Sequence, residues 1–208
     1  MSRSPGPPMP EARAGRRAVH EERTRRFIVD ATKELIRTEG LAQLNTRRIA
    51  ETASFAVGTL YNYFADFSEI LAYVAADYLD EVYTVVLHDI EGIDNFEQRI
   101  RRATGIYAGY FLKNPEAFKV VFMAPIDPIP VALEQHLLIP RVAVLVHETF
   151  VQAGETGLVP KHHCELIEDM LGSTVHGMLL FHITGRSHST AEAVLDRIDE
   201  VIRLLLSG

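Results

Sequence analysis

The sequence contains no tryptophan, one cysteine and no long uninterrupted run of apolar residues. A single cysteine, Cys164, cannot form an intrachain disulfide, which excludes the small disulfide-stapled folds and fits a reducing compartment. A helix that crosses a bilayer needs about 18 to 20 apolar residues in succession, so we expect no membrane span. The Pro- and Arg-rich N-terminus also lacks the apolar core of a signal peptide. The expected location is the cytoplasm, with no membrane partner.

Strand and enzyme signatures are missing as well. There is no alternating strand pattern, internal repeat, nucleophile elbow, phosphate-binding loop or HExxH pair. The one cluster of metal-ligating types is His162-His163-Cys164-Glu165, but adjacent side chains on a helix point about 100 degrees apart, whereas zinc sites need wider or paired spacing. We therefore expect an all-α protein that is not an enzyme and holds neither a cofactor nor a metal.

Charge is divided unevenly along the 208 residues, whose formal net charge is −7. Residues 1–50 hold 11 Lys and Arg against 6 Asp and Glu, and the remainder holds 10 against 22. This division indicates a basic head that meets a polyanion and an acidic body that does not. The alternative is a basic tail that arises by chance.

Apolar spacing and capping residues predict the order of the helices. Residues 1–19 have four prolines and four arginines and are expected to form a disordered basic arm. A first helix over 21–39 and two short helices within 45–64 would make a head over 20–65. A body over 66–208 would follow, with helices at 66–89, 95–112, 115–123, 140–154, 160–184 and 190–206. Pro125, Pro128 and Pro130 forbid a continuous helix between the third and fourth of these.

The segment 46–64 has the dimensions of a helix-turn-helix. At about 100 degrees per residue, Leu60 and Phe64 fall on one side, where they would pack on Ile49 and Ala53. The opposite face is then small, polar and aromatic, which suits the major groove of DNA. The expected DNA-contacting residues are Thr46, Arg47, Arg48, Gly58, Thr59, Tyr61, Asn62 and Tyr63.

Each type in this set has a chemical reason. Gly58 allows close approach of the backbone, Thr59 can bond a phosphate or touch a thymine methyl, and Asn62 can pair with base edges. Arg47 and Arg48 lie at a helix start, where side-chain charge and free backbone amides together favour phosphate oxygens. The alternative is that the aromatic residues are ordinary core residues of a short helix.

These residues also carry a resemblance. Ile49-Ala50, Ala53, Gly58-Thr59-Leu60-Tyr61 and Tyr63-Phe64 are similar to the signature of the tetracycline-repressor (TetR) family, over roughly residues 21–75. The resemblance implies a three-helix DNA-binding head, a body of about six more helices with an effector pocket, and a homodimer joined mainly by its last two helices.

The sequence departs from the family pattern in two places. Ser54-Phe55-Ala56 replaces the usual Gly-Val-Ser of the turn, so the recognition helix lacks its usual serine cap. Either Ser54 or another group compensates, or that helix end is weaker by about 1 kcal/mol. Phe67 replaces a lysine that commonly reaches a phosphate, so one phosphate contact is in doubt.

The body holds aromatic residues with a few polar tips and, near its end, two apolar stripes. We expect an effector pocket lined by Tyr107, Phe111, Phe118, Phe122, Met123, His147, Phe150 and His176, the alternative for each being the core. The stripes consist of Ile167, Leu171, Met178, Val194, Ile198, Val201 and Leu205, with the spacing of a helix-pair packing face. The resemblance makes these seven residues the expected dimer interface; the alternative is packing within one chain, because spacing alone cannot tell whose helix is facing.

Together these features predict a ligand-responsive transcriptional regulator, by default a repressor. It would bind palindromic operator DNA as a homodimer, with half-sites about one helical turn apart, and would be released by a small apolar or aromatic effector. The alternative is a helical small-molecule- or metal-binding protein, or an enzyme, that does not act on DNA.

Overall fold

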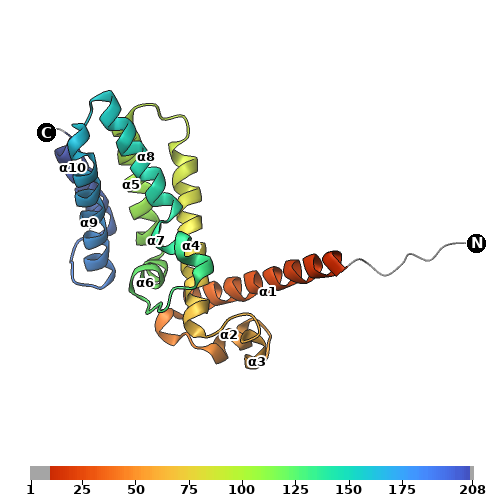
Figure 1. The fold of residues 1–208 in the computed structure, drawn as a ribbon. Helices are drawn as coiled ribbons and strands as arrows, with labels where there is room; N and C mark the ends of the chain where they lie inside the picture. The colour runs from red at the N-terminus through yellow and green to blue at the C-terminus, as the bar shows by residue number, and fades with distance from the viewer. Residues whose placement is uncertain (1–9, 207–208) are drawn as a thin grey trace, which may run out of the picture. The chain divides into compact units, whose positions relative to one another are not determined.

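The structure, a computed structural model, describes residues 10–206 and is helical throughout its regular elements (Figure 1). The all-α prediction is therefore confirmed. The chain divides into two compact units, the first ending at Val74 and the second beginning at Ala75.

The first unit contains α1 (Pro10–Glu39), the 3-10 turn η1 (Leu41–Gln43), α2 (Thr46–Thr52), α3 (Val57–Leu60) and the first turns of α4 (Phe67–Ile90). Helix α2 packs against both α1 and α3. The core of this unit is built from apolar residues of all four helices and of the turns after α2 and α3, among them Ile28, Leu35, Ile36, Ile49, Ala53, Leu60, Phe64, Ile70 and Val74.

Helix α1 begins earlier than expected. It starts at Pro10, so residues 10–19 are helical and the disordered-arm prediction is wrong for them. The residues that follow Pro10 are mostly alanine, arginine and glutamate, which favour helix, and Arg17 pairs with Glu21 one turn on at 2.8 Å. Pro10 itself suits a first helical turn, where no amide hydrogen is needed. The rest of the predicted arm, 1–9, lies outside the described residues.

The boundary between the units also differs from the expected 65/66. The start of α4 belongs to the first unit because its side chains complete that core. Tyr73 lies edge-on to Phe64, with ring centroids 5.5 Å apart, and the Arg25 guanidinium lies over the Tyr73 ring at 6.0 Å.

The second unit continues α4 and adds α5 (Phe96–Lys113), α6 (Pro115–Met123), η2 (Val131–Leu133), α7 (Glu134–Leu138), α8 (Arg141–Thr156), η3 (Lys161–His163), α9 (Cys164–Ile183) and α10 (Ala191–Leu206). Helix α5 packs against α6, α8, α9 and α10, so it is the centre of this unit. A two-pronged ion pair joins α5 to α10: Arg101 Nε and Nη2 lie 2.6 and 3.0 Å from the Asp199 carboxylate, and this pairing lowers the pKa of Asp199.

Helix α8 ends later than the sequence predicts. Gly154, expected to end it, is inside the helix, and Gly157 in the left-handed conformation (φ 79°) ends it instead. Gly154 serves packing: a Cβ there would lie 2.7 Å from the Cys164 sulfur.

One segment, Val131–Thr156, is long and apolar enough by composition to cross a membrane. In the structure Ile139 and Pro140 interrupt it, so that it consists of the separate elements η2, α7 and α8. One such segment is weak support for a membrane span.

Candidate DNA-binding face and body cavity

Helix α2 begins with a side-chain cap. Asn45 is its N-cap, and its side-chain oxygen accepts a hydrogen bond from the Arg48 backbone N–H at 3.0 Å. This bond satisfies one of the free amides of the first turn. Ile49 and Ala50 then face the core, as the helical angles predict.

Helix α3 and the turn after it divide into the two expected faces. Leu60 and Phe64 are buried, whereas Gly58, Tyr61 and Asn62 are exposed. Thr59 and Tyr63 are half-buried, as is Thr46. The fully exposed part of the predicted DNA-contacting set is therefore smaller than the set itself, because Thr46, Thr59 and Tyr63 are half-buried.

In the turn between α2 and α3, Ser54 replaces the glycine of the family pattern at a position with a left-handed backbone. Ser54 has φ 57°, the left-handed region in which glycine is favoured. Phe55 follows it, half-buried, with its ring edge-on to Phe27 at a centroid distance of 6.0 Å. Ala56, the N-cap of α3, makes no side-chain hydrogen bond, as predicted.

Ala56→Ser should supply the missing cap. Ala56 is exposed and its backbone is extended (φ −72°, ψ 147°), the conformation in which a serine hydroxyl can accept from the amides of the first turn. We expect the free energy of unfolding to rise by about 1 kcal/mol. Urea denaturation followed by circular dichroism measures it, with Ala56→Gly as the comparison; a serine variant no more stable than wild type would contradict the missing-cap interpretation.

The two arginines of α2 are held by carboxylates of their own unit. Arg47 Nε lies 2.9 Å from Glu51, and Arg48 donates to Glu39 and lies 3.9 Å from Glu51. Both side chains are exposed. Exposed ion pairs contribute only about 0 to 1 kcal/mol, so a DNA phosphate can compete for either guanidinium.

Helix α4 begins with a capping box. The Glu69 backbone N–H donates to Asp66 Oδ1 at 2.8 Å, and the Glu69 carboxylate accepts from the Ala65 N–H. A second hydrogen bond in this region was not predictable from the sequence. Arg25 Nε on α1 donates to the Tyr63 carbonyl at 3.1 Å and so fixes the turn that follows α3. No local pattern relates these two residues, which are 38 positions apart.

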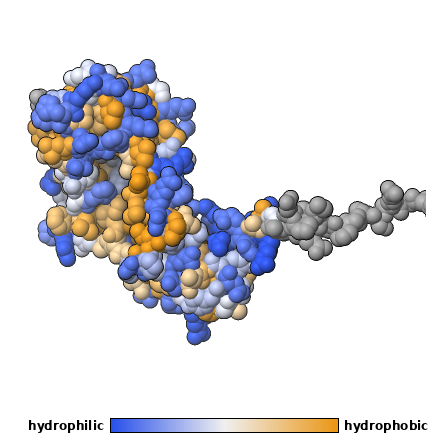
Figure 2. Space-filling model, in the orientation of Figure 1, coloured by the Kyte–Doolittle hydropathy of each residue, from blue (hydrophilic) through white to orange (hydrophobic). Residues whose placement is uncertain are grey.

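The second unit contains a cavity of about 580 Å³, within the size range of small-molecule sites. Residues from α4, α5, α6, α8 and α9 line it, together with the segment 124–140. Its walls are mostly aliphatic, including Leu79, Val121, Ile126, Ile129, Leu137, Val142, Val146, Leu171 and Val175. Apolar side chains also reach the surface of α7 and α8, as Figure 2 shows.

Three of the eight predicted pocket residues line this cavity: Tyr107, Phe122 and His176. Phe111, Phe118 and Phe150 do not line it, because they are buried in the core, where Phe111 packs edge-on against Phe118 at 5.6 Å. Met123 is exposed, and His147 lies on the outer side of α8; neither lines the cavity. The sequence missed the aliphatic walls because such residues are equally common in any core.

Tyr107 and His176 form a hydrogen-bonded pair in the cavity wall. The Tyr107 hydroxyl oxygen lies 2.7 Å from His176 Nε2, and the rings are edge-to-face at 5.7 Å. Burial lowers the pKa of His176 and raises that of Tyr107, so both are uncharged near neutral pH. The pair therefore presents hydrogen-bonding groups without charge.

His147 and Glu168 connect α8 to α9. His147 Nδ1 lies 2.9 Å from Glu168 Oε2, and this hydrogen bond, reinforced by the carboxylate charge, raises the pKa of His147. Glu168 also lines the cavity, so this bridge lies beside the cavity wall.

These two histidines should give stability opposite slopes with pH. His147 binds its proton more tightly when folded, so its contribution is complete below about pH 6.5 and is lost as pH rises through its raised pKa. His176 binds its proton less tightly when folded, so stability falls as pH drops below about 6.5. Unfolding titrations from pH 5 to 8 should show His147→Gln removing the loss on the alkaline side alone and His176→Gln removing the loss on the acid side alone. Unchanged profiles in both variants would contradict these pKa directions.

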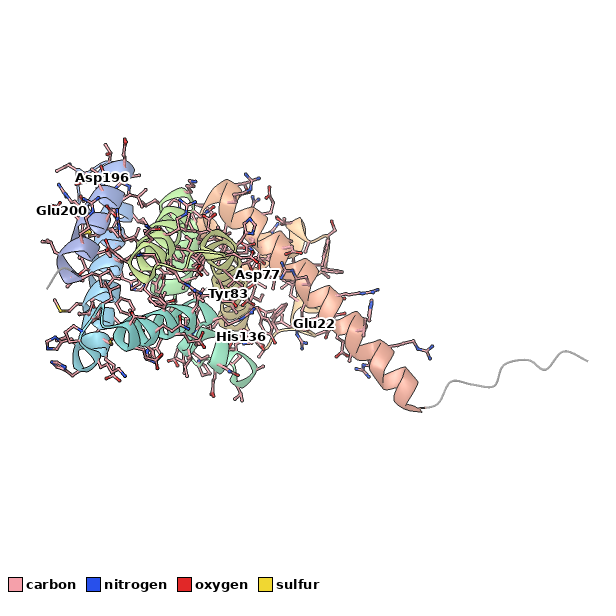
Figure 3. All side chains as sticks on the ribbon, turned by 90° about the horizontal axis from the view of Figure 1, so that it is seen from above. Glu22, Asp77, Tyr83, His136, Asp196 and Glu200 are labelled. Atoms are coloured by element: carbon pink, nitrogen blue, oxygen red, sulfur yellow. The ribbon has the colours of Figure 1, made fainter. Side chains whose placement is uncertain are left out.

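The predicted apolar stripes of α9 and α10 are not exposed on the surface of the chain. Leu171, Val194 and Ile198 are buried within the chain, so the prediction that they face a second copy is wrong. Ile167, Met178, Val201 and Leu205 are only half-buried. The stripes pack α9 and α10 onto the body, and the outer side of α10 is acidic at Asp196 and Glu200, labelled in Figure 3.

A different side of α9 is apolar and exposed. Leu166, Met170 and Phe181 are 56, 47 and 52% exposed, and they recur at positions that share one helical face. Leu204 of α10 is 68% exposed. Exposed apolar groups in such a row mark a surface that meets another molecule more often than chance would.

The cysteine and histidine cluster has a packing role. Cys164 is buried, and its thiol donates to the Pro160 carbonyl at 3.7 Å, while the rings of His162 and His163 contact each other at a tilt of 52° with centroids 4.1 Å apart. Within residues 10–206, no three His, Cys, Asp or Glu side chains are grouped so as to hold a metal.

The comparisons with known proteins agree with this architecture. Residues 28–74 match the family described as bacterial regulatory proteins, tetR family. No curated protein sequence matches the chain.

Solved structures resemble most of the chain in fold. FadR of Bacillus subtilis, in complex with stearoyl-CoA, has a TM-score of 0.68 at 17% identity, over 88% of this chain and 97% of its own. RolR, in complex with resorcinol, has a TM-score of 0.71 at 15% identity, over 90% and 89%. PfmR of Thermus thermophilus, a TetR-family transcriptional regulator, has 0.64 at 17% identity, over 87% and 97%. Residues 28–74 therefore carry a segment similar to the tetR family of bacterial regulatory proteins, within a chain whose fold resembles these solved structures.

Proposed function

We propose that this protein is a cytoplasmic, homodimeric repressor that binds palindromic operator DNA through α2 and α3 and is released by a small apolar or aromatic effector. The observation that carries the proposal is the exposed row Gly58, Tyr61 and Asn62, beside a helix start with two arginines. Exposed polar and small groups on a second helix of this kind suit base contacts, and the arginines suit phosphates.

The cavity supports the ligand-responsive part of the proposal. RolR and FadR, which share this fold, are in complex with resorcinol and with stearoyl-CoA. Here Leu79 of α4 lines the cavity, and the same helix begins within the first unit. A ligand that displaces Leu79 can therefore act on α4, and a coupling of about 1 to 3 kcal/mol would change DNA affinity roughly 5- to 150-fold.

The exposed row on α9 supports the homodimer. Leu166, Met170 and Phe181 present an apolar face that a second copy related by two-fold symmetry would cover with the same face. Two heads on such an axis would bind two half-sites, which accounts for a palindromic operator.

A mobility-shift titration tests the proposal and separates it from a helical ligand-binding protein or enzyme that does not act on DNA. The probe is the region upstream of the protein's own gene, compared with random DNA from low to moderate salt. We expect a clear preference for the upstream region, and Asn62→Ala should reduce it by about 1 to 3 kcal/mol. Gln43→Ala, an exposed polar change of similar size outside the row, should have no effect. Equal binding of both DNAs would refute the regulator function.

A further inference from the structure

The polar groups of the cavity wall carry no positive charge. Among described residues, those that line the cavity include the carboxylates of Glu168 and Asp169 but neither lysine nor arginine. The acid Glu168 already accepts from His147, and Asp169 is exposed. An anionic ligand would lose its hydration without gaining a countercharge, which is costly in an apolar cavity.

The hydrogen-bonding direction of the Tyr107–His176 pair follows from its neighbours. The His176 imidazole also bonds the Gly172 backbone, one helical turn before it, where the carbonyl oxygen has a second lone pair that can accept a ring N–H. The ring nitrogen that faces Gly172 therefore carries the proton of the neutral imidazole, and Nε2 accepts from the Tyr107 hydroxyl. The Tyr107 oxygen then retains lone pairs that only a donor can use.

From these observations we propose that the cavity binds an uncharged amphiphile, an alcohol or phenol with an apolar body, whose hydroxyl donates a hydrogen bond to the Tyr107 oxygen. The inference deepens the proposed function and rests on its ligand-responsive part. The aliphatic walls hold the apolar body, while the Tyr107–His176 pair selects the donor group and the absence of a countercharge rejects carboxylates.

Three probes of similar length distinguish the effect of a hydrogen-bond donor from the effect of a charge: 1-decanol, decyl methyl ether and decanoate. Isothermal titration of the DNA-free, full-length protein should show decanol binding roughly three- to tenfold more tightly than the ether, the effect of one hydrogen bond. Decanoate should bind at least about tenfold more weakly than decanol, because it is charged and cannot donate.

Two matched variants locate the effect. Tyr107→Phe should reduce decanol affinity to that of the ether and leave ether binding unchanged, which also shows that the variant is folded. Tyr110→Phe removes a hydroxyl from the same helix, where it donates to Glu81 and does not line the cavity, and should leave all three affinities unchanged.

The proposal is overturned if decanol does not bind, if decanoate binds as tightly as decanol, or if Tyr107→Phe keeps the preference for decanol over the ether. None of these titrations contains DNA, so they are independent of operator binding. If the protein prefers decanol but shows no DNA preference, the ligand class stands and the proposed regulator function fails. If it prefers operator DNA but not decanol, the regulator function stands and the ligand class fails.

Discussion

Replacing Gly58 with alanine should make the first unit more stable and yet weaken its binding to operator DNA. A Cβ built at Gly58 meets no atom within 4 Å, so the fold has room for it. Alanine favours helix over glycine by about 0.5 to 1 kcal/mol, and the free energy of unfolding should rise by up to that amount. On the proposed face the added methyl lies where the DNA must approach the backbone, so affinity should fall at least about tenfold.

Gly109→Ala is the matched control for this prediction. Gly109 lies within α5, in the second unit, and a Cβ there also has open space. The control should gain similar stability with no change in DNA affinity. Thermal denaturation and fluorescence anisotropy on labelled operator DNA measure the two quantities. If Gly58→Ala bound DNA as wild type does, the outward face of α3 would not be the DNA-reading face.

Phe181→Glu should convert the proposed homodimer to a monomer and thereby reduce operator affinity about 100-fold or more. A charge at this position, 52% exposed on the apolar row of α9, would be buried without a partner in a dimer. Loss of the second head removes the gain from linked binding, which typically amounts to 10²- to 10⁴-fold.

Leu87→Glu on α4 provides the comparison, because Leu87 is an exposed apolar residue, at 41%, outside the α9 row. Sedimentation velocity should find this variant in the wild-type association state and Phe181→Glu at half its mass, with circular dichroism unchanged in both. A Phe181→Glu protein that stayed dimeric would place the interface elsewhere.

Helix positions were largely predictable because their causes are local. Asn45, Asp66 and Asn95 each bond an amide of the turn that follows, so these starts depend only on residues three positions apart. Leu60 of α3 is buried and Asn62, in the turn after α3, is exposed, and this division likewise follows from helical angles. Local reasoning failed at two helix ends. The Pro- and Arg-rich composition of residues 1–19 did not show that α1 begins at Pro10, and Gly154 packs against Cys164 inside α8 instead of ending that helix.

The functional surfaces also include features that local patterns predict and features that depend on long-range packing. Local residue patterns specify an all-helical chain with a helix-turn-helix near its start and the residue types of its exposed face. The tertiary structure decided that Tyr107 and His176 meet across 69 positions, that Phe111 and Phe150 belong to the core, and that the apolar row left uncovered on α9 is not the predicted stripe. Periodicity shows which residues share a helical face, but whether that face is covered depends on long-range packing, which no local pattern specifies.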